Sequence, residues 1–186
     1  MANDATNQFP ARERQRGFTL VEVLVTLAVA SVLFATAVPS MQDFITRNHM
    51  STEVNNFIAS LYVARSEAVK RVQTVAVCPA NSDFTDCIDS TDWQGGWMVF
   101  LDANQDGKLT NGSDEILQRY PALPSRFAVN GNQSLFAYDS SGQLYNPGSN
   151  GTYTFCDTGS VAKTRKITVS REGRVRVDQL TSVGCS

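Results

Sequence analysis

The sequence predicts an α+β protein in which a long N-terminal helix packs on a mainly antiparallel β-sheet. Residues 18–38 form an almost unbroken apolar run, and residues 39–72 continue it with apolar side chains at three- and four-residue spacings. Such spacing places the apolar side chains on one face of a helix. After residue 72 the pattern changes to short apolar runs separated by turns rich in Gly, Asn and Ser, which is typical of antiparallel strands. Helix and sheet each have an apolar face that the other can cover.

We divide the chain into four segments. These are a hydrophilic leader at residues 1–17, an apolar helix at 18–38, an amphipathic helix at 39–72 and a β-rich head at 73–186. The chain of 186 residues has room for one domain beyond the helix. Its net charge of −2 would by itself argue against nucleic-acid binding.

The apolar run is long enough to cross a membrane. Its one charged residue is Glu22, and as a helix it would extend about 30 Å, the thickness of the hydrocarbon core. Arg12, Arg14 and Arg16 precede the run, and the next basic residue is Arg47. The positive-inside rule therefore predicts a cytoplasmic N-terminus and an exported head. Because a carboxylate in a membrane span is costly without a partner, Glu22 is a candidate functional residue.

The junction before the apolar run has a specific pattern. Residues 17–22 read Gly-Phe-Thr-Leu-Val-Glu, whereas an ordinary secretory signal is cleaved after its apolar run. A plain signal anchor would explain the span but not this junction. The stretch resembles the processing signal of type IV pilins and type II secretion pseudopilins. The resemblance implies cleavage after Gly17 by a prepilin peptidase, N-methylation of Phe18 and a single helix that continues through Pro39.

The resemblance also implies a role for Glu22 in filament assembly. Cleavage would free the α-amino group of Phe18, which needs a counter-charge in an apolar filament core. Glu22 of a neighbouring subunit can provide it. Since an unpaired carboxylate in apolar surroundings is expensive, the pairing would select the axial register.

Two further stretches resemble the GspH/FimT group of minor pilins and pseudopilins. Residues 64–68 read Ala-Arg-Ser-Glu-Ala, and residues 96–102 read Gly-Trp-Met-Val-Phe-Leu-Asp. Major pilins lack the Gly-Trp run, so the resemblance implies a minor subunit. Its partners would be other major and minor pilins or pseudopilins, and its location the bacterial inner membrane and then a pilus or pseudopilus.

Within the head we expect short strands and one hairpin. The hairpin would turn at residues 139–142, Asp-Ser-Ser-Gly. The strands are expected at 74–78, 97–101, 116–120, 135–138, 143–145, 153–156, 166–169 and 175–177.

The four cysteines all lie on the side predicted to be exported, where disulfides persist. Three pairings are possible. We favour Cys78–Cys87, which closes a local loop, and Cys156–Cys185, which would tie down the C-terminal segment. Zinc is the alternative, but the chain has no CxxC pair and its one histidine, His49, lies far upstream.

A loop in the head has some features of a calcium site. Asp102, Asn104 and Asp106 place oxygen ligands at loop positions one, three and five, and Gly107 follows at position six. Position twelve, where a bidentate Glu is expected, is Ser113, and the flanking runs read as strands rather than helices. We therefore favour a polar turn with local Asx hydrogen bonds over a Ca²⁺ site, and we predict no cofactor.

The C-terminal segment concentrates basic residues in an acidic chain. Arg174 and Arg176 alternate with Val175 and Val177, so on a strand the two arginines share one face. Arginine forks suit phosphate oxygens. The basic residues are Lys163, Arg165, Lys166, Arg171, Arg174 and Arg176, with Gly173 at an expected turn.

Residues 173–176, Gly-Arg-Val-Arg, also match the Gly-Arg-x-Arg motif of FimT-type pilins that bind DNA during natural transformation. The resemblance implies that Arg174 and Arg176 contact double-stranded DNA, helped by the other basic residues. The alternative is a solvated edge strand whose charges prevent aggregation. Since no aromatic residue is interleaved, binding should favour phosphate, tolerate most sequences and weaken with salt.

No enzymatic site is predicted, because a chain with one histidine offers little for a Ser-His-Asp or Cys-His arrangement. The first hypothesis is a minor pilin that contributes to type IV pilus assembly and binds DNA for uptake. The second is the H-type minor pseudopilin of a type II secretion system, which has protein partners only. A membrane-anchored calcium-binding module ranks third, since it depends on the loop at Asp102 alone.

Overall fold

A computed structural model describes residues 17–110, 112–145 and 150–180, without the side chains at 36, 39, 40, 43 and 160–163. The predicted leader up to residue 16 lies outside these ranges. The chain divides into two compact units, Met1–Phe44 and Ile45–Ser186. A single helix, α1 (Leu20–Arg71), begins in the first unit and ends in the second. Its 52 residues include Pro39, which confirms one helix rather than two.

Local side-chain chemistry explains where α1 begins and ends. The Thr19 hydroxyl accepts a hydrogen bond from the backbone N–H of Glu22 at 3.2 Å, so Thr19 is the N-cap. At the other end Val72 adopts a positive φ of 57°, which stops the helical hydrogen-bond ladder.

The first unit exposes most of the large apolar side chains that α1 carries there, as at Leu24, Leu27 and Phe34. Within the described residues, no helix proves sufficiently long and apolar to cross a membrane. The span expected at residues 18–38 stays a prediction.

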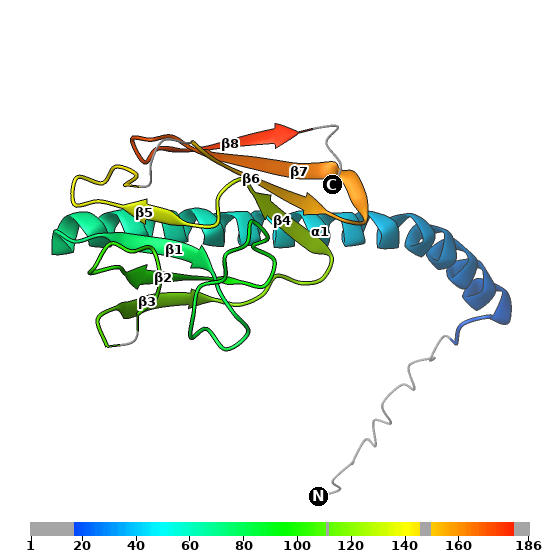
Figure 1. Cartoon of the computed structure of the whole chain (residues 1–186). Coiled ribbons are helices and arrows are strands. Elements are labelled where there is room, and N and C mark those ends of the chain that lie inside the picture. Colours follow the sequence, from blue (N-terminus) through cyan, green and yellow to red (C-terminus); the bar gives the residue numbers. More distant parts are fainter. Residues whose placement is uncertain (1–16, 111, 146–149, 181–186) are drawn as a thin grey trace, which may run out of the picture. The chain divides into compact units, whose positions relative to one another are not determined.

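The head contains two four-stranded sheets, and every strand pair in them is antiparallel (Figure 1). The strand order is β3-β2-β1-β5 in the first sheet and β4-β6-β7-β8 in the second. The strands are β1 (Val75–Pro79), β2 (Trp97–Leu101), β3 (Glu115–Tyr120), β4 (Phe127–Gly131), β5 (Phe136–Tyr138), β6 (Gly151–Asp157), β7 (Ser160–Val169) and β8 (Val175–Leu180).

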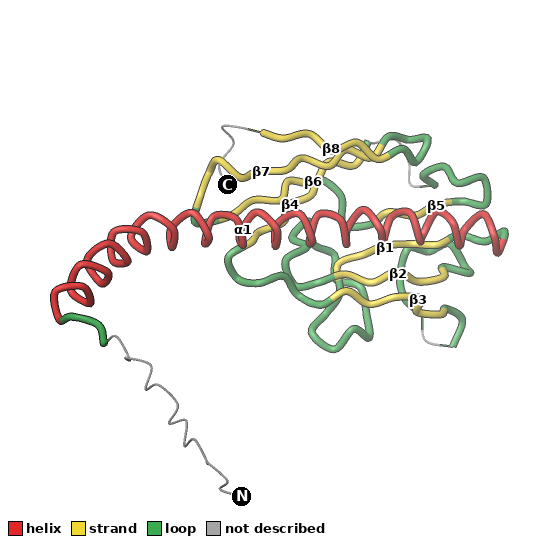
Figure 2. The backbone as a smooth tube through the Cα atoms, turned by 180° about the vertical axis from the view of Figure 1, so that it is seen from behind, coloured by secondary structure: helices red, strands yellow, loops and turns green. Residues whose placement is uncertain are grey.

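The amphipathic half of α1 joins the two sheets into one core (Figure 2). Its buried side chains follow the predicted three- and four-residue spacing and comprise Met50, Val54, Phe57, Leu61, Ala64 and Ala68. The Phe57 ring contacts Trp97 of the first sheet and both Tyr153 and Phe155 of the second, with ring centroids 4.7–5.4 Å apart. Neither sheet alone would cover this ring, so the helix and both sheets stabilise one another.

The Gly-Trp run belongs to this core. A Cβ on Gly96, whose φ is +98°, would lie 2.5 Å from the carbonyl oxygen of Tyr120. The neighbouring Trp97 is buried, and its indole N–H donates to the Ser60 hydroxyl at 3.0 Å. The run therefore fastens β2 to α1 and β3, which is a structural role.

Three expectations about the sheet were wrong or incomplete. The head has two sheets, not one. The segment 143–145 forms no strand, only an isolated bridge between Tyr138 and Leu144. The backbone N–H of Leu144 donates instead to the carbonyl oxygen of Arg171 at 2.9 Å, so it is not available to extend a ladder with β5. Strand β4 was missed, although its alternating Phe127 and Val129 are buried in the core.

Candidate functional sites

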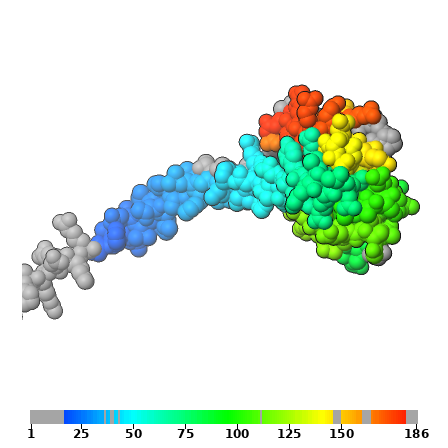
Figure 3. All heavy atoms as spheres, turned by 90° about the vertical axis from the view of Figure 1, so that its left-hand side faces the viewer, coloured from blue at the N-terminus to red at the C-terminus, as the bar shows by residue number. Residues whose placement is uncertain are grey.

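The predicted basic segment forms the hairpin of β7 and β8, at the surface of the head (Figure 3). Val169 pairs with Val175, and both pack toward the core. Thr168 pairs with Arg176, and Lys166 pairs with Asp178. Because side chains alternate along a strand, these four residues lie on the opposite, outer face of the sheet.

Three of the predicted cations gather on this outer face, and we call Lys166, Arg174 and Arg176 the basic face. The side chains of Arg174 and Arg176 are 79% and 80% exposed, and Lys166 is half-buried. Arg174 directly precedes β8 and is separated from Arg176 by the inward-facing Val175.

The other predicted cations do not join the basic face. Arg165 is the neighbour of Lys166 on β7, so it points to the other side of the sheet, where its guanidinium lies against Gln179. Arg171 lies in the exposed turn. The side chain of Lys163 lies outside the described residues.

Each arginine of the basic face has an acidic neighbour. The Arg176 Nε donates to the Asp178 carboxylate at 3.0 Å. An Arg174 nitrogen lies 3.8 Å from the carboxylate of Glu172. A hydrogen bond from Ser170 and the nearby Arg174 lower the pKa of Glu172, so this carboxylate is charged at neutral pH. Sequence reasoning missed Asp178, which an i, i+2 pattern on a strand would have revealed.

The turn before β8 is fixed to the rest of the head. Gly173 has a φ of +73°, and a Cβ there would lie 2.6 Å from the Gly142 carbonyl oxygen. An Arg65 nitrogen donates to the Gly173 carbonyl oxygen at 3.3 Å. The N–H of Leu144 donates to the Arg171 carbonyl oxygen. Helix α1 and the loop after β5 therefore position the turn that carries Arg174, a role of Arg65 that the sequence did not reveal.

The predicted processing site lies at the beginning of the described chain. Gly17 and Phe18 precede α1 and are exposed. Glu22 is exposed in the first turn of the helix, two residues after its first residue Leu20. The cap by Thr19 shows that the Thr-x-x-Glu pattern has a local role in starting the helix.

The disulfide predicted between Cys78 and Cys87 is confirmed. It ties the loop after β1 back to that strand. Cys156 is also disulfide-bonded. Its predicted partner, Cys185, lies outside the described residues.

The aspartate-rich loop holds itself together by backbone hydrogen bonds to carboxylates, as the Asx interpretation predicts. Asp102 is buried and accepts the N–H groups of Asp106 at 3.2 Å and Gly107 at 3.0 Å. Burial raises the pKa of Asp102, and these hydrogen bonds oppose the rise. Asn104 donates to Asp106. In the described part of the chain, no group of three or more His, Cys, Asp or Glu residues is arranged to hold a metal ion.

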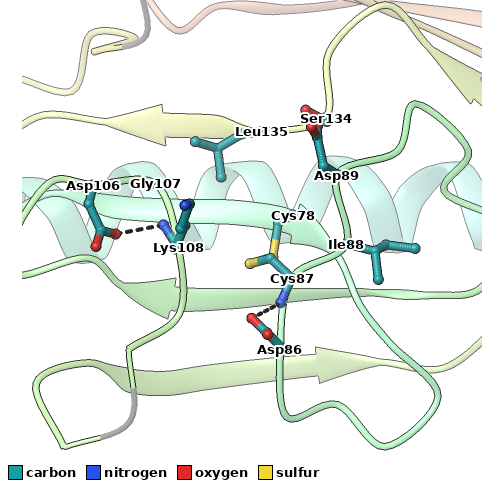
Figure 4. A pocket seen from close by; sticks show the side chains of 10 residues that line it. All are labelled: Cys78, Asp86, Cys87, Ile88, Asp89, Asp106, Gly107, Lys108, Ser134 and Leu135. Carbon is teal, nitrogen blue, oxygen red and sulfur yellow. Dashed lines mark hydrogen bonds between the residues drawn. A yellow bond between two sulfur atoms is a disulfide. The ribbon is translucent and has the colours of Figure 1, made fainter.

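A pocket of about 480 Å³ lies between this loop and the disulfide (Figure 4). Asp86, Asp89 and Asp106 line it together with Lys108. Asp86 and Asp106 each accept a backbone N–H, from Cys87 and Lys108 respectively. These carboxylates therefore support their own loops, and nothing in the pocket indicates a ligand.

Comparisons with known proteins agree with this architecture. The family model described as type II transport protein GspH matches residues 53–173, and the prokaryotic N-terminal methylation motif matches residues 12–38. Fimbrial protein EcpC of Eikenella corrodens is 39% identical over 44 residues, which are 24% of this chain and 29% of EcpC. A fimbrial protein of Pseudomonas aeruginosa is 29% identical over 99 residues, which are 51% of this chain and 64% of that protein. The chain thus spans less than two thirds of the length of either curated relative.

Two solved structures share the fold. The minor pilin FimU of Pseudomonas aeruginosa superposes with a TM-score of 0.54 at 19% identity, over 73% of this chain and 92% of FimU. The minor pseudopilin EpsH of the Vibrio cholerae type 2 secretion system superposes with a TM-score of 0.50 at 13% identity, over 70% of this chain and 97% of EpsH. At these identities the likeness shows the fold alone.

The helix, the two sheets and the N-terminal motif define a pilin-like subunit. Since the GspH model spans more than half of the chain, the protein belongs to the GspH family. Proteins of this family are structural subunits, not enzymes. The methylation motif implies anchoring in the inner membrane.

Proposed function

We propose that the protein is a minor subunit of a type IV pilus that contributes to pilus assembly and binds DNA for uptake. The observation that carries the assignment as a minor pilin-like subunit is the presence of the methylation motif and the GspH match in one chain. The fimbrial relatives support a pilus more than a secretion system. The H-type pseudopilin of a type II secretion system is the alternative.

The proposal includes a processing route. A prepilin peptidase cleaves after Gly17 and Phe18 is then N-methylated. Before assembly, residues 18–38 cross the inner membrane with the N-terminus in the cytoplasm and the head in the periplasm. The arginines just before the apolar run and the exposed Gly17–Phe18 junction support this order of events.

The basic face supports the proposed binding of double-stranded DNA. Arg174 and Arg176 are highly exposed and lie on one side of the sheet. Lys166 lies on the same side of the neighbouring strand β7, two residues before Thr168, which pairs with Arg176. Guanidinium groups bind phosphate oxygens well, and the outer face offers no described aromatic ring among these cations to stack a base. Binding through the phosphate backbone follows, with little sequence preference.

The test is DNA binding by the full-length chain in nonionic detergent, measured by fluorescence anisotropy over a salt series. Arg174→Ala/Arg176→Ala should weaken binding and reduce the slope of log K against log salt by about 2, since each phosphate contact contributes about 0.9. Arg47→Ala/Arg119→Ala removes the same charge from other exposed positions and should leave binding near the wild type. Absence of binding at low salt would overturn the DNA part and leave the pseudopilin alternative.

A further inference from the structure

The two arginines of the basic face are both engaged with carboxylates of their own hairpin. Asp178 lies two residues after Arg176 on the same side of β8, and it pairs across the sheet with Lys166. Glu172 lies two residues before Arg174 across the turn at Gly173. Each carboxylate therefore lies beside a guanidinium nitrogen that a phosphate oxygen could otherwise approach.

We propose that Asp178 and Glu172 act as built-in competitors of the DNA phosphates, so that the basic face binds DNA only by exchanging carboxylate for phosphate. This inference rests on the proposed DNA binding and adds a means of setting its strength. It predicts that the protein binds DNA more weakly than its cations alone would allow.

The exposure of these pairs makes such an exchange feasible. The side chains of Asp178 and Glu172 are 38% and 60% exposed, and those of their arginines are more exposed still. Exposed ion pairs of this kind change an equilibrium constant by less than about fivefold, so a phosphate can displace the carboxylate at small cost. A buried pair such as an Arg on a fully desolvated acid would resist the exchange.

The two acids are not equivalent. Asp178 accepts a hydrogen bond from Arg176 at 3.0 Å and also pairs in the strand register with Lys166, so it neighbours two of the three cations of the basic face. Glu172 is 3.8 Å from Arg174 and receives a hydrogen bond from Ser170, which keeps it partly engaged within the turn. We expect the larger effect from Asp178.

Amide variants test the proposal because they remove charge while keeping shape. Asp178→Asn retains a side-chain oxygen that can accept a hydrogen bond from Arg176, so the hairpin should fold unchanged. Asp178→Asn should tighten DNA binding about two- to fivefold at low salt, and the gain should shrink as salt screens the charges. Glu172→Gln should give a smaller gain. Both variants are compared with the wild type as full-length chains, in the same anisotropy assay, with thermal unfolding measured alongside.

Two controls separate local competition from overall charge. Asp89→Asn removes one negative charge from an exposed loop of the other sheet, between β1 and β2, and should leave affinity close to the wild type. Asp178→Asn in an Arg176→Ala background should give no gain, because the competitor acts through that arginine.

The outcomes distinguish this inference from the proposed function. A gain in Asp178→Asn that exceeds the gain in Asp89→Asn and vanishes without Arg176 supports it. Equal gains in the two variants, or a gain that persists without Arg176, overturn the competition while the DNA binding stands. If the wild type and both amide variants fail to bind at the lowest salt, the DNA binding itself is overturned.

Discussion

At the residue scale, position 173 sets two requirements that only glycine meets. The φ of +73° at Gly173 lies in the left-handed region, and the Gly142 carbonyl oxygen occupies the space that a Cβ would take. Gly112 shares only the first requirement, since its φ is +95° and a Cβ added there would meet nothing within 4 Å. Comparing alanine substitutions at Gly112 and Gly173 therefore separates the cost of backbone strain from the cost of steric crowding.

We expect Gly112→Ala to destabilise the head by about 1–2 kcal/mol, the cost of a left-handed alanine. Gly173→Ala should destabilise the head by about 1–3 kcal/mol more than Gly112→Ala does, because the turn must also move away from Gly142. That movement would also displace Arg174 and weaken DNA binding, whereas Gly112→Ala should not. Urea unfolding and the anisotropy assay measure the two effects. Equal destabilisation by both variants would show that the turn has room to adjust.

The residue scale also shows where sequence reasoning about the site reached its limit. Alternation correctly placed Arg174 and Arg176 on one side of the chain, away from Val175. The same rule puts Arg165 on the opposite side from Lys166, a consequence that a count of charges overlooks. The contact between Arg65 and Gly173 joins residues far apart in the chain, so no local pattern could have revealed it.

At the scale of elements, ion pairs of Arg71 connect the end of α1 to the first sheet. Arg71 donates to Glu67 on its own helix and to Glu115 at the start of β3, each at 2.7 Å. Lys70 also pairs with Glu67 at 3.3 Å. Hydrogen bonds from Arg71 and then Lys70 lower the pKa of Glu67 below its ordinary value of 4.5.

This lowered pKa predicts a specific loss of stability in acid. The unfolded chain binds a proton at Glu67 before the folded chain does, so the stabilisation is complete above the ordinary pKa of 4.5 and is lost as the pH falls through the folded value. Glu67→Gln should reduce the free energy of unfolding at neutral pH and flatten its fall on the acid side. Urea unfolding across an acid pH series measures this. Asp89→Asn is the control for loss of one carboxylate, and an identical slope in both variants would contradict the prediction.

The elements themselves were predicted as well as their sequence signals allowed. The helix is continuous from Leu20 to Arg71 because its apolar spacing persists and Thr19 caps it. Segment 143–145 looked like a strand because Leu144 and Tyr145 are apolar. Its backbone N–H groups, however, donate in two directions, from Tyr145 to the Ala137 carbonyl oxygen and from Leu144 to the Arg171 carbonyl oxygen. The division into two sheets depends on which strands pair, and pairing is a long-range property that runs of apolar residues do not encode.

At the scale of the whole molecule, the two ends of the chain are proposed to have separate tasks. The N-terminal segment is proposed to join the filament, and the basic face is proposed to bind DNA. The core cluster contains no residue of the N-terminal segment and none of the three basic-face side chains; its buried residues come mostly from the second half of α1 and from inward-facing positions of the two sheets. Variants at one end should therefore leave the function of the other intact, which makes the two proposals separable by mutation.

The proposed assembly role of Glu22 provides the clearest case. Glu22 is exposed in the first turn of α1 and is not among the buried core residues. In a filament its carboxylate would neutralise the methylated α-amine of a neighbouring subunit, and losing it would leave that amine unpaired in an apolar environment. We expect Glu22→Ala to be cleaved after Gly17 at the normal rate but to enter pili at a small fraction of the wild-type level. Its head should unfold at the wild-type temperature and bind DNA normally.

Cleavage is measured by the shift in mass of the membrane-inserted chain, and incorporation by immunoblotting of sheared pili from cells that express each variant. Glu53→Ala is the matched control, because it removes a carboxylate from the later part of the same helix and should assemble as the wild type does. If Glu22→Ala were incorporated normally, the amine would need another counter-charge and the pairing would be wrong. If Glu22→Ala were not cleaved, the carboxylate would be required by the peptidase before any filament forms, and its role would move from assembly to processing.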